Sequence, residues 1–236
     1  MAQAGAAAAR EPARRRRLDV ASRRDEIVVA AIELYSRVPA DVVTLDDVAA
    51  AAGVSRALVY RYFGSRSELY QEAMQAAASR LLAVLDVPAS GDPFARLVEA
   101  IRRYFDFAEQ HATGLLALMS GVTVVPAGPI GAIVQDVRDR LVERLVDALG
   151  LPHAGGHLRV ALRAWMASVE AAALDWLQHR DTERGDVEAM LVLQMLGALQ
   201  ATAAHDRAIA RLLARYASTM GSATPAEAPV RRGRRG

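Results

Sequence analysis

The sequence predicts an all-α protein, and three observations support this fold class. Hydrophobic residues make up 53% of the 236 residues, whereas aromatic residues make up only 5%. No stretch alternates between apolar and polar residues with the period of two that marks a half-buried strand. Helix start signals recur instead, each an N-cap residue with an acid three positions later, as in Thr44 and Asp47. The hydrophobic fraction is large enough for a buried core, which excludes a wholly disordered chain.

The first part of the chain predicts four helices after an N-terminal tail. Residues 1–21 are rich in arginine, and we expect them to be disordered. A first helix is expected at about 23–37. Two short helices separated by a glycine follow, and then a long helix, at about 45–52, 56–62 and 66–86.

The second part of the chain predicts six further helices. Asp92 before Pro93 places a cap residue ahead of a proline that suits the first helical position, and Gly150 is a stop signal. The expected helices lie at about 93–111, 114–120, 129–149, 156–180, 186–204 and 207–217. The composition then turns to Ser, Pro, Gly and Arg, so residues 218–236 are expected to form a disordered basic tail.

The informative motif spans residues 44–63, where two short helices joined at a glycine describe a helix-turn-helix. Gly53 suits a left-handed turn position. Val59 and Phe63 are four positions apart and so place one face of the second helix on the core. The opposite, outer face of this helix carries Arg56, Ala57, Tyr60 and Arg61. A short helix that begins after Ser55 and has this outer face fits the DNA major groove, although an ordinary helical hairpin is the alternative.

The residues around this motif also follow a known pattern, formed by Thr44, Val48, Ala49, Ala52, Gly53, Val54, Ser55, Tyr60, Phe63, Arg66 and Leu69. They resemble the N-terminal signature of the TetR family of bacterial transcriptional regulators. The resemblance implies an N-terminal three-helix helix-turn-helix DNA-binding domain at 22–70. It also implies a larger helical-bundle domain at 71–217 that binds an effector and dimerises.

The resemblance assigns phosphate contacts to three positions. In that family the residues that match Thr44, Tyr60 and Arg66 bond to DNA phosphates, contacts that set the register and carry most of the salt-dependent affinity. Arg61 stands where the family often has histidine or a large aromatic residue, and it adds a charge beside the DNA backbone. Leu58 stands where a threonine or serine is frequent, so one phosphate contact is expected to be missing.

The resemblance assigns base contacts to Ser55, Arg56 and Ala57. An arginine can make a bidentate contact to guanine, and an alanine can touch a thymine methyl group. Because of the departures at Leu58 and Arg61, the operator sequence does not transfer from relatives. A run at Arg14–Arg17 has two open interpretations, an arm that reaches the minor groove or a solvated tail.

The apolar pattern of one predicted helix indicates a homodimer, and the resemblance to the TetR family implies the same. The segment at 186–204 is apolar around most of its circumference, so it must be buried on more than one side. Packing inside its own domain and against a twin helix in a partner would satisfy both sides. A two-fold dimer presents two recognition helices to a palindromic double-stranded DNA operator.

A ligand pocket is expected between the helices near 93–120 and 156–180. The alternative is that these side chains are ordinary core, because aromatic and Met stripes at helical spacing are typical of a core. The effector would be a small apolar or amphipathic molecule of unknown identity. The candidate lining residues are Tyr104, Phe105, Phe107, His111, Met119, Trp165, Met166 and Glu170.

Other classes of function find no support in the sequence. The chain has no cysteine, which excludes disulfides, thiolate metal sites and a cysteine nucleophile. Two histidines, His153 and His157, are separated by glycines and lack a third metal ligand. The acids of 136–147 alternate with arginines and indicate a solvated helix face. We therefore expect no catalytic residues, cofactor, metal or membrane span, and a cytoplasmic location.

These observations favour a ligand-responsive transcriptional repressor that leaves its operator when the effector binds. Two other hypotheses stay open, an architectural or effector-less DNA-binding protein and a helical-bundle enzyme. The charge pattern supports DNA binding, because positions 55–66 hold three arginines and no acid although the net charge of the chain is only +2.

Overall fold

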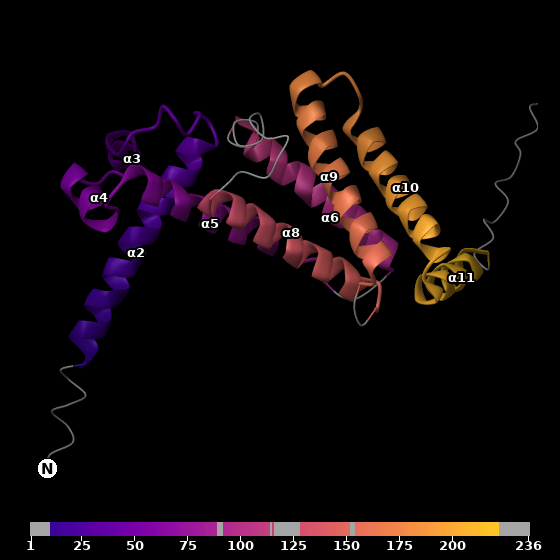
Figure 1. Ribbon diagram of the computed structural model, residues 1–236. Coiled ribbons are helices and arrows are strands. Elements are labelled where there is room, and N and C mark those ends of the chain that lie inside the picture. Colours follow the sequence, from indigo (N-terminus) through magenta and orange to yellow (C-terminus); the bar gives the residue numbers. More distant parts are fainter. Residues whose placement is uncertain (1–9, 89–91, 114, 116–127, 152–153, 222–236) are drawn as a thin grey trace, which may run out of the picture.

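The computed structural model describes residues 10–88, 92–113, 115, 128–151 and 154–221, with side chains described from residue 22 to residue 215 within those ranges (Figure 1). All regular secondary structure in these ranges is helical, which confirms the all-α fold class. The helices are α2 (Arg10–Tyr35), α3 (Leu45–Ala51), α4 (Arg56–Tyr62), α5 (Arg66–Val84), α6 (Pro93–Gln110), α8 (Pro129–Ala148), α9 (Gly156–His179), α10 (Arg184–Ala203) and α11 (Arg207–Gly221).

The predicted cap residues begin the helices where the sequence indicated. Ser65 accepts a hydrogen bond from the backbone N–H of Glu68 at the start of α5. Asp92 accepts from two backbone N–H groups at the start of α6, and Pro93 occupies the first helical position. These side chains replace the partners that the first N–H groups of a helix lack, so they fix the helix starts within a residue or two of the expected ones.

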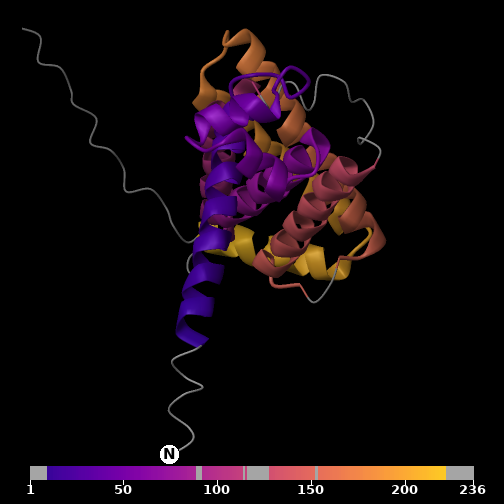
Figure 2. The same cartoon turned by 90° about the vertical axis from the view of Figure 1, so that its left-hand side faces the viewer.

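Helix α2 differs most from expectation. It begins at Arg10, so the expected start near Arg23 is wrong and the tail from Arg10 onward is helical. Arginine and alanine are good helix formers, and Pro12 lies in the first turn, where its missing N–H has no intrahelical partner to lose. In two perpendicular views the amino-terminal half of α2 extends beyond its neighbours (Figures 1 and 2).

Two other expected segments fall partly outside the described residues. The helix expected at 114–120 lies there except for residue 115, and so does the tail from residue 222 onward. Residues 218–221, which were expected to belong to the disordered tail, are helical, because α11 continues to Gly221. The remaining expected helices match the observed ones closely.

Within the described part of the chain, two hydrophobic cores are joined by helix α5. The reading head, which we define as α2, α3, α4 and the first half of α5, encloses the smaller core around Ile27, Val48, Phe63 and Leu69. The body, defined as α6 and α8–α11, encloses the larger core around Phe105, Leu162, Leu191 and Leu199. Helix α5 packs against α2 at its start and against α6 and α8 further on, and α11 lies at the end of the molecule opposite α4 (Figure 1).

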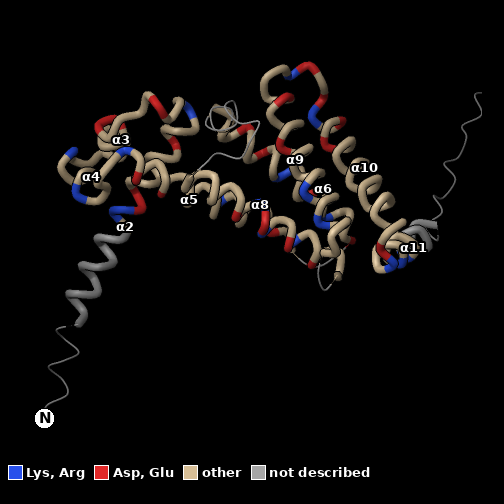
Figure 3. The backbone as a smooth tube through the Cα atoms, in the orientation of Figure 1, with Lys and Arg blue, Asp and Glu red and all other residues tan. Residues whose placement is uncertain are grey.

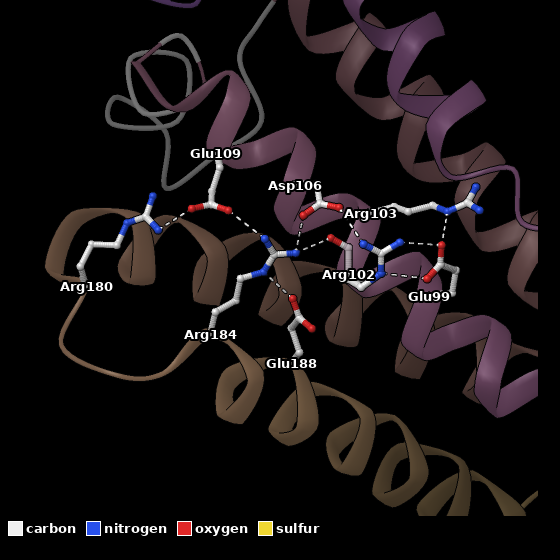
Figure 4. A network of polar contacts seen from close by, with 8 residues as sticks. All are labelled: Glu99, Arg102, Arg103, Asp106, Glu109, Arg180, Arg184 and Glu188. Atoms are coloured by element: carbon white, nitrogen blue, oxygen red, sulfur yellow. Dashed lines mark hydrogen bonds and ion pairs between the residues drawn. The ribbon is translucent and has the colours of Figure 1, made fainter.

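An ionic network fastens α10 to α6 (Figure 4). The Arg184 side chain is 24% exposed and lies 2.7 Å from Asp106, 2.8 Å from Glu109 and 2.6 Å from Glu188. Arg180 also reaches Glu109, at 2.7 Å. Because Arg184 is shared among several acceptors and half-buried, the network holds its geometry better than an isolated surface pair does. It fixes the first turn of α10 relative to α6.

Candidate nucleic-acid interface and effector cavity

Helices α3 and α4 form the predicted helix-turn-helix. Thr44 caps α3 in a reciprocal capping box with Asp47, and Ser55 caps α4 by accepting the N–H of Leu58. Gly53 between the two helices has φ +64°, the left-handed conformation that glycine adopts without penalty. Val59 is fully buried, so the corner is packed as the sequence predicted.

The outer face of α4 carries the predicted DNA-facing side chains. Arg56, Ala57, Tyr60 and Arg61 are all exposed, and Tyr60 retains 47% of its surface. The structure therefore brings these four residues together on one side of a helix whose other side is core. Figure 3 shows the basic positions of α4 at the outer edge of the reading head.

Arg56 is held on the surface by its neighbours. Its Nε lies 2.7 Å from Asp46 Oδ1, an ion pair without hydrogen-bond alignment. Its Nη2 donates to the Tyr60 hydroxyl at 3.5 Å, and the guanidinium lies 5.5 Å from the centre of the Tyr60 ring. The sequence reasoning missed Asp46, whose contact crosses the turn between α3 and α4. A base contact by Arg56 requires this exposed ion pair to open.

Thr44 and Arg66, the expected phosphate-binding residues, also have partners within the protein. The Thr44 hydroxyl donates to Asp47 Oδ2 at 2.6 Å, and the hydroxyl and backbone N–H of Thr44 together lower the pKa of Asp47. Arg66 Nη1 donates to the Asp41 carbonyl at 2.7 Å. The two side chains are thus oriented in advance at the edge of the reading head. Their phosphate contacts stay a prediction.

A cavity of about 460 Å³ lies in the body. Its walls come from the segment that directly follows α5 and from α6, α8, α9 and α10. Of the predicted ligand-binding residues, Tyr104, Trp165, Met166 and Glu170 line it. A volume of this size falls in the range that holds a drug-sized molecule.

The other predicted ligand-binding residues do not line this cavity. Phe105 is buried in the core, with its ring centre 5.6 Å from that of Trp176. Phe107 and His111 contact each other, 4.4 Å between ring centres, further along α6, and burial lowers the pKa of His111. Met119 lies outside the described residues. The spacing of the aromatic residues identified α6 as a helix that lines the cavity, but it did not show where along α6 the cavity ends.

The prediction of a solvated face on α8 is partly wrong. Arg138 donates from Nε and Nη2 to the two carboxylate oxygens of Glu170 on α9, at 2.9 and 2.5 Å. The two side chains are only 24% and 19% exposed. Arg140, in contrast, forms the expected exposed pair with Asp136. This partly buried pair was missed because its partners lie on two helices far apart in the sequence.

Two arginines from the body hold the last turn of α5. Arg103 of α6 donates to the carbonyls of Val84 and Asp86, at 3.1 and 3.4 Å. Arg144 of α8 donates to the carbonyl of Leu82 at 2.5 Å. The last carbonyls of a helix lack intrahelical partners, and a cation there also opposes the helix dipole. Arg144 and the residues directly after Val84 line the cavity, so its wall adjoins the last turn of α5.

Helices α9 and α10 expose large apolar side chains on their outer surfaces. Val160 is 59% exposed, Met190 45% and Leu193 68%. The chain from Ala189 to Ala203 carries no charged residue, which is seen as an uncoloured stretch of α10 in Figure 3. Exposed apolar residues gathered on two adjacent helices are typical of a surface that binds protein.

Two further properties concern the described part of the chain. No helix there is both long and apolar enough to cross a membrane. No group of three or more His, Asp or Glu side chains there is arranged to hold a metal ion.

Comparison with known proteins yields matches to both parts of the chain. Residues 27–73 match the model of bacterial regulatory proteins of the tetR family, and residues 93–198 match that of a tetracyclin repressor-like C-terminal domain. A tetR-family transcriptional regulator from Streptomyces coelicolor is 34% identical, with a TM-score of 0.77 over 84% of this chain and 89% of that one.

More distant likenesses extend to regulators with described roles. The fatty acid degradation regulator FadR from Bacillus halodurans is 15% identical, with a TM-score of 0.56 over 74% of this chain and 93% of that one. The transcriptional activator FasR from Mycolicibacterium smegmatis is 30% identical over 100 residues, which are 42% of this chain. The match spans 46% of the length of that curated relative.

Proposed function

Because this chain belongs to the TetR family of bacterial transcriptional regulators, we propose that it is a homodimeric repressor whose palindromic operator is released when a small apolar or amphipathic molecule fills the cavity. The observation that supports the proposal most is the position of the cavity. It is lined by Leu85 and the residues that follow it directly after α5, and the first half of α5 belongs to the reading head.

In this proposal α4 enters the major groove. Ser55, Arg56 and Ala57 face the bases at its start, and Thr44, Tyr60, Arg61 and Arg66 contact phosphates around it. The exposure of the α4 residues and the position of Arg66 at the start of α5 support this arrangement. Phosphate contacts position the protein, and base contacts specify the sequence.

A gel shift with the DNA upstream of the protein's own gene tests the DNA-binding role. We expect specific retardation at physiological salt, and its loss in Tyr60→Ala, because the exposed Tyr60 side chain contributes nothing to the core. Tyr62→Phe is the matched control. Because Tyr62 is partly buried, this substitution should leave DNA binding unchanged. Specific binding that survives in Tyr60→Ala would contradict the assigned contact.

The apolar surface of α9 and α10 supports the dimer. A two-fold axis beside α10 would bury Met190 and Leu193 against their symmetry mates, and the small residue Gly197 would allow the helices to approach closely. Light scattering at micromolar concentration should give twice the mass of the chain, and Leu193→Glu should give the monomer mass. Val98→Glu, at an exposed apolar position on α6, is the control. A monomeric unsubstituted protein would overturn the dimer.

We propose that the effector releases the operator by moving the last turn of α5. A ligand shifts an equilibrium only through its different affinities for the two states. Arg103 and Arg144 hold the last turn of α5, and a ligand that displaces Arg144, which lines the cavity, would change the tilt of α5. The two reading heads of the dimer would then no longer match the half-site spacing of the operator.

Activation is a second candidate, favoured by the name of the curated relative, a transcriptional activator. In-vitro transcription from a template that carries the operator separates the two roles. Addition of the protein lowers transcript yield in the first case and raises it in the second.

A further inference from the structure

The cavity has a largely apolar wall, and its lining also includes a tyrosine and five charged residues. Its apolar wall includes Leu97, Ile101, Met166, Met195 and Leu199. The polar corner, which we define as Tyr104 of α6 and Glu170 of α9, lies inside this wall. Arg96 is the nearest charged lining residue on α6 and stands eight residues earlier, about 12 Å along the helix axis.

The Tyr104 hydroxyl is a hydrogen-bond donor without an acceptor among the described residues. It differs from the Tyr35 hydroxyl in the reading head, which also lacks a partner but is sealed by its neighbours. Tyr104 lines the cavity and retains accessible surface there, although it is buried from bulk water, and burial followed by the Glu170 charge raises its pKa. The hydroxyl is therefore neutral at physiological pH and available to a ligand.

Glu170 supplies acceptors beside that donor. Both of its oxygens accept from Arg138, yet a carboxylate has about four acceptor positions, so each oxygen retains one. Arg138 balances the charge of Glu170, and the corner has no cation to spare. A second carboxylate placed here would meet Glu170 at short range in a medium of low polarity, where like charges repel strongly.

The other charged residues of the wall are two arginines and two aspartates, so together they add no net positive charge to it. Arg144 is bonded to the Leu82 carbonyl, and Arg96 Nε is sealed without a partner. Asp86 and Asp147 also line the cavity, and their charges equal those of the two arginines in number.

We propose that the cavity selects a neutral apolar molecule with one hydroxyl group, which accepts from the Tyr104 hydroxyl and donates to Glu170, and that it rejects free carboxylates. The inference rests on the proposed function, since it names the chemistry of the effector that the cavity would take. It assigns a specificity role to Tyr104 and Glu170.

Titration calorimetry of the full-length protein with octan-1-ol, octanoate and octylamine tests this proposal, because the three probes share one alkyl chain. We expect octan-1-ol to bind at least about tenfold more tightly than octanoate and octylamine. Trp165 lines the cavity and gives an independent fluorescence signal. Tighter binding of octanoate or octylamine would overturn the proposal, and so would the absence of octan-1-ol binding at its solubility limit.

Variants separate the polar corner from general apolar binding. Tyr104→Phe should weaken octan-1-ol by about threefold to tenfold, the equivalent of one neutral hydrogen bond, and leave octanoate unchanged. Glu170→Gln still accepts from Arg138 but removes the negative charge, so it should strengthen octanoate by about tenfold or more. Tyr62→Phe in the reading head is the control. Unchanged octan-1-ol affinity in Tyr104→Phe, or unchanged octanoate affinity in Glu170→Gln, would contradict the proposed contacts; thermal unfolding shows whether each variant is folded.

The same samples distinguish failure of this inference from failure of the proposed function. If octan-1-ol binds with the expected variant pattern and operator binding does not respond, the ligand chemistry stands and the release mechanism falls. If the operator is bound specifically and the octan-1-ol pattern fails, the regulator stands and the neutral ligand is wrong.

Discussion

Arg56 is restrained by Asp46 before any DNA is present, and this restraint has a measurable consequence. An exposed ion pair is screened by water and contributes little, whereas a bidentate base contact contributes roughly 1–3 kcal/mol. In the complex with DNA, Arg56 should therefore leave Asp46 and contact the base. Arg56→Ala should cost about 1–3 kcal/mol on the operator and less on other sequences.

Asp46→Asn should have the opposite effect. It frees Arg56 and removes an acid near the DNA phosphates, so affinity should rise for all sequences when measured by fluorescence anisotropy at low salt. Asp175→Asn, an exposed acid in the body, is the control. Weaker binding by Asp46→Asn would mean that Asp46 orients Arg56 for the base.

Gly53 contributes conformation rather than space. A Cβ added there would touch nothing within 4 Å, but the φ of +64° is unfavourable for other residues. Gly53→Ala should therefore destabilise the protein by about 1–2 kcal/mol in denaturant unfolding. Gly185→Ala in α10, which also meets open space but has no positive φ, should not be destabilising. Equal unfolding midpoints for the two variants would refute this explanation.

At the scale of residues, local periodicity predicted the exposed face of α4 and the buried Val59 and Phe63 correctly, because both depend on helix geometry alone. It could not predict the Asp46 pair, which depends on how α3 crosses α4. Only some of the eight expected ligand-binding residues line the cavity, for the same reason. Tyr104 and Glu170 face one cavity because two helices cross there, and the sequence of each helix says nothing about the crossing.

Among the elements, cap residues predicted the helix starts well, since a cap acts through neighbouring backbone groups. Helix α2 shows the limit of this approach, because arginines that indicated a solvated tail are also good helix formers. The contacts that hold the α5 end join residues 19, 17 and 62 positions apart, which no local pattern indicates.

The α5 end gives a prediction at this scale. Arg103→Met combined with Arg144→Met removes the side chains that bind the carbonyls of Leu82 and Val84, so the last turn of α5 should fray. Hydrogen exchange of the backbone amides there should become faster, and a cavity ligand should change operator affinity less than in the unsubstituted protein. Arg140→Met on the exposed side of α8 is the control. Unchanged exchange would show that packing alone holds the turn.

For the whole molecule, the distribution of charge determines how binding depends on salt. Arg66 is present twice in a dimer, and each phosphate contact adds about −0.9 to the slope of log affinity against log salt. Arg66→Gln should therefore reduce the slope by about 1.8 and weaken all sequences alike. Arg211→Gln, at an exposed position on α11, should leave the slope unchanged. A slope that responds equally to both would mean that the charge acts through the overall field of the protein.

The position of α11, at the end of the molecule opposite α4, bears on how the protein can be handled (Figure 1). A tether attached to the carboxyl end of α11 would leave the reading head pointing away from a solid support, whereas a tether on α2 would sit beside it. Immobilised through α11, the protein would face solution with its DNA-binding surface, the orientation that a sensor chip or an affinity column for DNA fragments requires.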